Sequence, residues 1–95
     1  MLSIALSRRA VKDLRRIGPG DELDRIRLAL EALGAGGAGF DIKPLRGQAP
    51  WLRLRVGDDR IPYRPISAEE GIDASHLVAR IVHRRDLERA VSTLA

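Results

Sequence analysis

Trp51-Leu-Arg-Leu-Arg-Val-Gly-Asp-Asp-Arg-Ile-Pro-Tyr-Arg64 contains two short alternations of apolar and polar residues, separated by a turn sequence. Alternation with a period of two predicts β-strands, and Gly57, Asp58 and Asp59 are the residue types that a tight hairpin turn requires. Any two-residue loop drawn from these three gives the hairpin two distinct faces. One face carries Arg53, Arg55, Arg60 and Arg64, and the opposite, core-facing side carries Leu54, Ile61 and Tyr63.

Four guanidinium groups on one small sheet face repel one another unless an anion lies between them. The hairpin therefore predicts a phosphate-binding face. Residues 43–64 contain six basic residues and only two acidic ones, in a chain whose net charge is +4. Such local asymmetry favours a nucleic-acid partner over general solubility, although a coding bias toward arginine, alanine and glycine is an alternative explanation.

Length and composition narrow the possible classes of protein. A chain of 95 residues predicts one domain, residues 1–95, with a single modest core. The absence of cysteine excludes disulfides and thiolate chemistry and fits a cytoplasmic protein. The apolar run over residues 1–6 is too short for a signal peptide or a membrane span, so we expect no membrane association.

The pattern along the chain predicts a small α+β fold in the order β-α-α-β-β-β-α. Alternation over residues 2–6 predicts the first strand, and Ser7 is expected to cap the helix that follows. Gly18-Pro19-Gly20 ends this helix, Asp21 is expected to cap the next one, and Gly34 closes it. The two helices predict a hairpin whose apolar stripe packs on a small, antiparallel-rich sheet.

The C-terminal third is predicted to complete this sheet. Residues 67–75 are polar and indicate a loop, whereas residues 76–82 are apolar on both faces and predict one central strand. Residues 84–94 predict a final helix with an inward apolar stripe. Pro62 and Pro65 lack a backbone N–H group, which favours an edge position for the second strand of the arginine hairpin.

Recognisable metal and nucleophile motifs are missing. His76 and His83 fall on opposite faces of one predicted strand, so they cannot share a metal, and neither a metal nor another cofactor is expected. The acidic residues are expected mostly on solvated helix surfaces, and the glycine-rich segment 34–39 lacks the lysine and hydroxyl residue of a phosphate loop. What remains is arginine-driven phosphate binding, with or without phosphodiester cleavage.

Three segments together resemble the RelE/ParE superfamily of bacterial toxins, which belong to type II toxin–antitoxin systems. They are Leu45-Arg46-Gly47, the stretch from Trp51 to Arg64, and Ile81-Val-His-Arg-Arg-Asp-Leu87. The order of elements matches from about residue 2 to residue 94. Members of the RelE branch are ribosome-dependent endoribonucleases that cleave mRNA without a metal, whereas the ParE branch poisons DNA gyrase. The His-Arg-Arg-Asp segment favours the RelE branch; a degenerate toxin that survives as an antitoxin-binding corepressor is a further alternative.

The resemblance also implies roles for individual residues. Arg60 matches the arginine that contacts the scissile phosphate, and Arg85 matches one that stabilises the charge developing there. Many members carry a tyrosine in the final helix as an acid–base group, where this chain has Glu88 and Val91. We therefore assign proton transfer to His83, because an ordinary histidine pKa of about 6.5 allows it. The predicted RNA contacts are Lys43, Arg46, Trp51, Arg53, Arg55, Arg64 and Arg84.

Partners follow from the same resemblance. A cognate antitoxin is expected to hold the toxin inactive, the ribosome and mRNA are the expected targets, and operator DNA is expected to bind only through the antitoxin. Three residue-level alternatives stay open. The arginine face can be an antitoxin-binding or merely solvated surface, His83 can be a hydrogen-bonded structural residue, and Trp51 can cover the edge of the core instead of stacking on a base.

Overall fold

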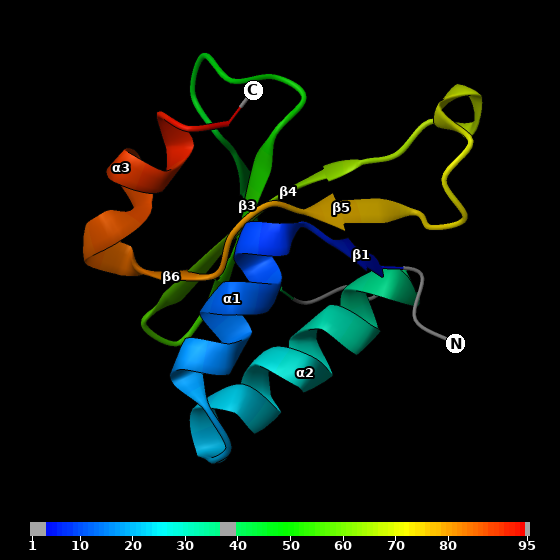
Figure 1. Ribbon diagram of the computed structural model, residues 1–95. Helices are drawn as coiled ribbons and strands as arrows, with labels where there is room; N and C mark the ends of the chain where they lie inside the picture. Colours follow the sequence, from blue (N-terminus) through cyan, green and yellow to red (C-terminus); the bar gives the residue numbers. More distant parts are fainter. Residues whose placement is uncertain (1–3, 37–39, 95) are drawn as a thin grey trace.

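The structure is a computed structural model that describes residues 4–36 and 40–94, and it consists of a helical hairpin, a twisted sheet and a short C-terminal helix (Figure 1). The strands are β1 (Ile4–Leu6), β2 (Asp41–Pro44), β3 (Leu52–Val56), β4 (Asp59–Pro65), β5 (His76–Val78) and β6 (Val82–His83). The helices are α1 (Arg8–Ile17), α2 (Asp21–Gly34) and α3 (Leu87–Val91), with 3-10 turns η1 (Ala68–Glu70) and η2 (Arg84–Asp86).

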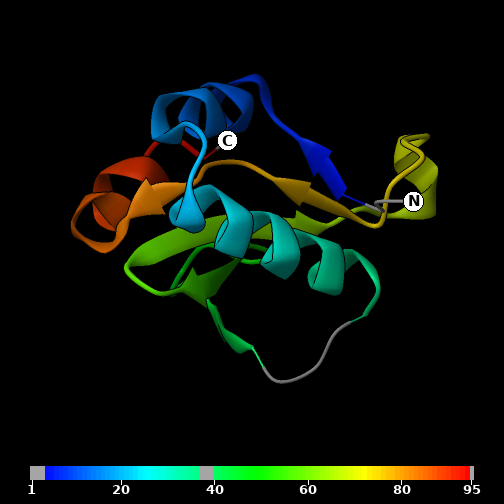
Figure 2. The same cartoon turned by 90° about the horizontal axis from the view of Figure 1, so that it is seen from below.

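The sheet has the strand order β1-β5-β4-β3-β2, and β6 also pairs with β4 (Figure 2). Strands β1 and β5 are parallel, whereas the other pairs are antiparallel. The predicted α+β class and antiparallel-rich sheet are therefore confirmed, and the sheet is mixed rather than purely antiparallel. Residues 2–3 of the first predicted strand and residues 37–39 of the connector lie outside the described residues.

Two helix boundaries were predicted from capping residues, and one of them is correct. Ser7 caps α1 as predicted: its hydroxyl accepts the backbone N–H of Ala10 at 3.0 Å and donates to the carbonyl of Ala79 at 2.6 Å. For α2 the prediction was wrong by one residue. Gly20 is the N-cap, and Asp21 is the first helical residue, where its charge still favours the positive end of the helix.

The main core lies between α2 and the sheet face opposite the arginines. Hydrophobic side chains of α2, including Ile26 and Leu30, pack in one cluster with Leu54, Ile61 and Tyr63 of the hairpin. Leu54 and Ile61 are fully buried, as the alternation of the sequence predicts. Burying one such side chain contributes roughly 1.5–3 kcal/mol, so the core fixes which hairpin face points outward.

Asp13 is buried, which corrects the expectation that acidic residues lie on solvated helix surfaces. It is 3% exposed on α1. Its carboxylate accepts hydrogen bonds from Arg80 Nε and from the backbone N–H of Ile81, both at 2.9 Å, and from Arg16 at 3.0 Å. A buried charge requires such partners, so this network attaches α1 to the segment between β5 and β6.

The same segment explains why residues 76–82 do not form one strand, as the sequence predicted. β5 pairs with residues 63–65 of β4, whereas β6 pairs with Asp59 and Arg60. Between them the chain turns Arg80 and the Ile81 N–H toward Asp13. The strand is therefore interrupted because its backbone donates to a helix side chain instead of to the sheet.

Strand β4 is central, so the prediction that its prolines mark an edge strand was wrong. β3 lies on one side of β4, and β5 and β6 lie on the other. The carbonyl of Pro62 accepts the N–H of Ala79 at 2.9 Å. The N–H and C=O groups of an extended residue point toward the same neighbouring strand. Pro62 therefore lacks its N–H on the side of β4 where β5 and β6 are interrupted. A proline is tolerated here because the ladder is already broken.

The C-terminal segment also differs in detail from its prediction. Residues 84–94 form η2 followed by α3, which ends at Val91, rather than one continuous helix. The polar loop over residues 67–75 contains η1, closed by Gly71 in the left-handed conformation with φ 68°. Within the described residues, none of the helices combines the length and apolar character needed to span a membrane.

Candidate nucleic-acid interface

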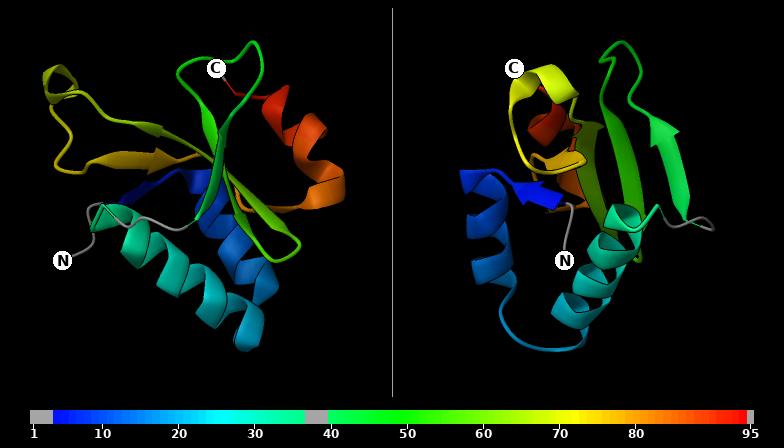
Figure 3. Two further views of the ribbon diagram at one scale, coloured as in Figure 1. Left: turned by 180° about the vertical axis from the view of Figure 1, so that it is seen from behind. Right: turned by 90° about the vertical axis from the view of Figure 1, so that its right-hand side faces the viewer.

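The arginine-bearing side of the sheet is the face opposite the main core. In Figure 3 (left), which shows the molecule from behind, β2 and β3 are not covered by a helix, and α3 lies beside them. Strand pairing places Arg55 opposite Arg60 and Arg53 opposite Pro62. The edge strand β2 adds two side chains to this face, because Lys43 lies opposite Arg53 and Asp41 lies opposite Arg55.

Arg60 is at the centre of the positive charge. Burial lowers its pKa, and the nearby charges of Arg55, Arg53 and Arg84 lower it further. We call Arg53, Arg55, Arg60 and Arg84 the guanidinium cluster. One terminal nitrogen of Arg60, Nη1, donates to the carbonyls of Gly57 at 2.9 Å and Asp59 at 3.1 Å. Its Nη2 and Nε make no hydrogen bond among the described residues, so the side of the guanidinium suited to bidentate phosphate binding is available.

Asp41 is the carboxylate that partly neutralises this cluster. Arg53 donates to its carbonyl at 3.0 Å and to its carboxylate at 3.2 Å, and Arg55 lies 3.6 Å from the other oxygen. Partial desolvation acts to raise the pKa of Asp41, but the Arg53 hydrogen bond and the charges of Arg53, Lys43 and Arg55 lower it overall. The Arg55 side chain remains 54% exposed and the Arg53 side chain 15% exposed. Arg53 is thus held in place, whereas Arg55 can reach an external anion.

The two arginines of η2 have different surroundings. The backbone N–H of Arg84 donates to the carbonyl of Asp58 at 2.8 Å, which fixes η2 against the hairpin turn. Its guanidinium lies 3.9 Å from the Asp58 carboxylate and contributes to the field at Arg60. Arg85 instead donates through Nε to Nδ1 of His83 at 3.2 Å. Arg84 therefore belongs to the cluster, whereas the side chain of Arg85 contacts His83.

His83 is not brought together with the guanidinium cluster. It pairs with Asp59, whereas Arg60 pairs with Val82, so alternation directs His83 toward the opposite side of the sheet from Arg60. Its Nδ1 caps η2 by accepting the backbone N–H of Arg85 at 3.2 Å. The structural alternative for His83 fits these contacts, since a proton on Nδ1 would break both hydrogen bonds to Arg85.

Asp59 lies behind the cluster, in a cavity of about 250 Å³ that His83 and Glu22 also line. Asp59 is 6% exposed. Burial, followed by a hydrogen bond with Glu22 and the charge of Glu22, raises the pKa of Asp59 to about 6, although Arg25 opposes the shift. The sequence indicates this burial, because every second residue of a strand lies on the same face. Asp59 therefore shares the core-facing side of β4 with Ile61 and Tyr63.

Arg64 and Trp51 lie on the arginine side of the sheet, but their contacts are with Glu70 and with each other rather than with the guanidinium cluster. Arg64 donates to both carboxylate oxygens of Glu70, at 3.0 and 2.8 Å. Its guanidinium carbon lies 5.8 Å from the centroid of the Trp51 ring, and Trp51 is only 9% exposed. The Trp51 ring is therefore largely buried beside Arg64. Arg46 is exposed in the connection between β2 and β3.

One member of this surface, Asp41, is not among the residues predicted from the sequence. Asp41 was missed because the strand β2 that carries it was not predicted. The proximity of Arg84 to Arg60 depends on the pairing of β6 with β4, which a single predicted strand over residues 76–82 did not specify. The alternation of charged residues around Ile42 is the one local signal that indicated a strand there.

Comparison with solved structures identifies the fold. A chain of the RelB-RelE antitoxin-toxin complex from Methanococcus jannaschii aligns with a TM-score of 0.67 and 25% identity, covering 90% of this chain and 95% of that one. A chain of the archaeal RelE-RelB complex from Pyrococcus horikoshii OT3 aligns with a TM-score of 0.58 and 23% identity, covering 85% and 92%. No protein-family model and no curated protein sequence matches. The protein is therefore RelE-like, with the RelE toxin fold over almost its whole length.

Proposed function

We propose that this protein is the toxin of a type II toxin–antitoxin pair and that it binds and cleaves ribosome-bound mRNA. The observation that carries the proposal is the guanidinium cluster, in which Arg60 is surrounded by three like charges and keeps two unbonded nitrogens. Like charges held this close together favour an anionic ligand. The RelE-like fold supports RNA as the source of that anion.

In the proposed reaction, the 2′-oxygen of the RNA attacks the adjacent phosphorus, and the bond from phosphorus to the 5′-oxygen breaks. The leaving 5′-oxygen takes up a proton, and the 2′-hydroxyl loses one. The crowded phosphorus centre carries more negative charge than the starting phosphodiester. Arg60 and Arg84 stabilise that charge, while Arg53, Arg55 and Lys43 hold the flanking phosphates.

The proposal assigns no proton transfer to the cluster. Arginine, with a pKa above about 12, is a poor general base at neutral pH. His83 caps η2 from the other side of the hairpin, so the proposal does not place it beside the reacting phosphate. The guanidiniums act by orienting the phosphate and stabilising charge, and the groups that exchange protons come from the ribosome-bound substrate or from solvent.

The proposed partners follow from this assignment. A cognate antitoxin holds the protein inactive, and the complex reaches operator DNA through the antitoxin rather than through this chain. The protein acts in the cytoplasm, where its ribosomal target is found. The two comparison structures are themselves antitoxin–toxin complexes, which supports an antitoxin partner.

The position of His83 also favours a second candidate. A toxin whose histidine lies away from its arginines fits a non-enzymatic role, either as a gyrase poison of the ParE type or as an antitoxin-binding corepressor. The same exposed arginine face would then contact protein or DNA rather than a reacting phosphate. Growth inhibition, mRNA integrity and DNA damage distinguish these possibilities.

The decisive experiment is induced expression in bacteria, with mRNA 5′ ends, protein synthesis and the DNA-damage response followed in parallel. New mRNA ends in phase with codons, lost in Arg60→Ala but retained in Arg15→Ala, support the nuclease. Arg15 is an exposed residue of α1 and provides the matched control. DNA damage with intact mRNA supports gyrase poisoning, and normal growth with antitoxin binding supports the corepressor.

A further inference from the structure

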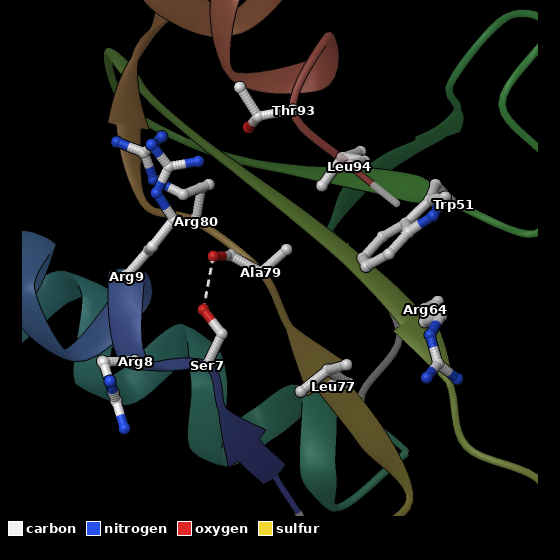
Figure 4. Close-up of a pocket in the computed structure, with 10 residues that line it drawn as sticks. All are labelled: Ser7, Arg8, Arg9, Trp51, Arg64, Leu77, Ala79, Arg80, Thr93 and Leu94. Atoms are coloured by element: carbon white, nitrogen blue, oxygen red, sulfur yellow. Dashed lines mark hydrogen bonds between the residues drawn. The ribbon is translucent and has the colours of Figure 1, made fainter.

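A second basic surface lies away from the guanidinium cluster, around a cavity of about 370 Å³ (Figure 4). Figure 4 shows Ala79 and Leu77 at its base, between Arg8, Arg9 and Arg80 on one side and Trp51, Arg64 and Leu94 on the other. The base comes from β5 and the residue after it, and the sides come from the start of α1 and the residues after α3. Trp51 precedes β3 and Arg64 lies in β4, so the cavity is formed where several distant parts of the chain meet.

The wall of this cavity is mostly apolar, and its charges are of one sign. Trp51, Leu77, Ala79 and Leu94 provide the apolar surface. The lining contains four arginines and no acidic residue. Two of these arginines already have carboxylate partners, because Arg80 is paired with Asp13 and Arg64 with Glu70.

The charges of the other two arginines are not neutralised by a carboxylate among the described residues. Among the residues that the structure describes, neither Arg8 nor Arg9 makes an ion pair or hydrogen bond through its side chain. Both are exposed in the first turn of α1, which contains no acidic residue. Cations at a helix N-terminus lie in an unfavourable field. A ligand that carries negative charge at this edge of the cavity would remove that unfavourable interaction.

The chemistry of the wall argues against a nucleic acid as the occupant. Single-stranded RNA or DNA binds through aromatic rings that stack on bases and through many phosphate contacts. Trp51 is buried, and Arg64 lies over its ring, so the ring is not presented as a stacking platform. An apolar wall with free charge on one side fits a peptide that combines an apolar side chain with carboxylates.

We propose that this cavity is a docking site for an acidic segment of the partner protein, with one apolar side chain inserted against Leu77 and Ala79 and carboxylates placed on Arg8 and Arg9. The proposal rests on the partner that the proposed function assigns, and it adds the place and the chemistry of the contact. Because the cavity does not include Arg55, Arg60 or Arg84, an occupied cavity leaves those side chains of the cluster uncovered by this segment.

Trp51 makes the proposal measurable, because it is the single tryptophan of the chain and lines the cavity. The probe is a capped peptide of glutamates around a central Leu-Leu pair, titrated into the full chain while tryptophan fluorescence is recorded. We expect a saturable change that weakens by about tenfold in the double variant Arg8→Glu and Arg9→Glu. Acidic residues are favourable in the first turn of a helix, so these substitutions do not weaken α1.

Control probes decide what occupies the cavity. A peptide with Ala-Ala in place of Leu-Leu, and one with lysines in place of glutamates, should each bind more weakly than the original. Arg15→Glu, on the same helix but outside the cavity, should bind like the wild type. No fluorescence change with the acidic peptide overturns the proposal. A stronger response to a uridine oligonucleotide, abolished by the same Arg8 and Arg9 substitutions, also overturns it in favour of nucleic acid.

A cellular experiment separates this proposal from the proposed function. The Arg8→Glu and Arg9→Glu variant should inhibit growth like the wild type, yet be neutralised less well by the co-expressed antitoxin. Equal neutralisation of both forms contradicts docking at the cavity while leaving the nuclease assignment intact. Failure of the wild type to inhibit growth contradicts the toxin assignment, and the peptide titration still tests the cavity.

Discussion

Arg55 on β3 and Arg60 on β4 lie directly opposite one another across the hairpin, on the face that the main core does not cover. Like charges in this position destabilise a sheet. Burial and the charges of Arg55, Arg53 and Arg84 accordingly lower the pKa of Arg60, and Asp41 compensates only part of this field. The folded chain therefore carries an unfavourable interaction that an external anion removes, as expected for a binding surface.

Replacing Arg55 should separate binding from stability. Arg55→Gln removes one of the opposed charges and one phosphate contact, while Asp41 keeps its hydrogen bond from Arg53. We expect RNA affinity to fall severalfold, and the free energy of unfolding to stay constant or rise by up to about 1 kcal/mol. Urea denaturation and oligonucleotide binding measure the two effects, with Arg15→Gln as the control. A clear loss of stability would mean that internal contacts hold Arg55.

Salt dependence reports how many phosphates the cluster contacts. The logarithm of the affinity for a uridine oligonucleotide should fall linearly with the logarithm of salt concentration, with a slope of about −0.7 for each phosphate contacted. Arg60→Ala should make the slope shallower by about that amount. Fluorescence anisotropy at several salt concentrations measures it. A flat response in the wild type would indicate that this face binds a protein instead.

Asp59 should make the protein less stable as the pH rises. Its pKa is raised to about 6, from an ordinary value of 3.8, by burial and by Glu22. The folded state therefore retains a proton that the unfolded state releases, and this contribution to stability is lost between about pH 4 and pH 6. Asp59→Asn should remove the slope and stabilise the protein at pH 8 by about 1–3 kcal/mol relative to wild type.

Urea unfolding at pH 4.5 and pH 8 tests this expectation directly. Glu22→Gln provides a matched variant, because it leaves Asp59 buried but removes the neighbouring charge. It should reduce the pH dependence without abolishing it. A wild-type protein whose stability increases from pH 4.5 to pH 8, with no difference in Asp59→Asn, would contradict the placement of this carboxyl.

The buried Asp13 should be important for folding. Asp13→Ala leaves the Arg80 guanidinium and the Ile81 N–H without their acceptor, and both lie between β5 and β6. We expect a loss of about 3 kcal/mol in the free energy of unfolding, because breaking a buried ion pair leaves an uncompensated charge. Replacing the exposed Asp24 of α2 by alanine is the control and should cost much less. Similar losses in both variants would contradict the network.

The hairpin was predictable because its alternation leaves one choice of inward face. Leu54, Ile61 and Tyr63 are inside, as expected, and the arginines lie on the other side. The same logic would have identified Asp59 as buried. Asp13 also had a signal, since it falls within the stripe formed by Ala10, Leu14 and Ile17, three residues after the first of them. In both cases a polar residue at a core position required a partner.

Other features depend on contacts that no local pattern contains. β2 has only four residues, two of them charged and one a proline, so its strand character comes from pairing with β3. The break between β5 and β6 depends on Asp13, which is 67 residues away from Arg80 in the chain. The central position of Pro62 follows from that break. These are tertiary effects that override local preference.

The most direct test uses purified ribosomes programmed with a defined mRNA, whose fragments are mapped after addition of the protein. We predict cleavage within the ribosome-bound codon by the wild type and by Arg15→Ala, and loss of cleavage in Arg60→Ala even though that variant folds. Intact mRNA with the wild-type protein, or equal cleavage by Arg60→Ala, would contradict the assignment of the guanidinium cluster as the site of phosphodiester cleavage.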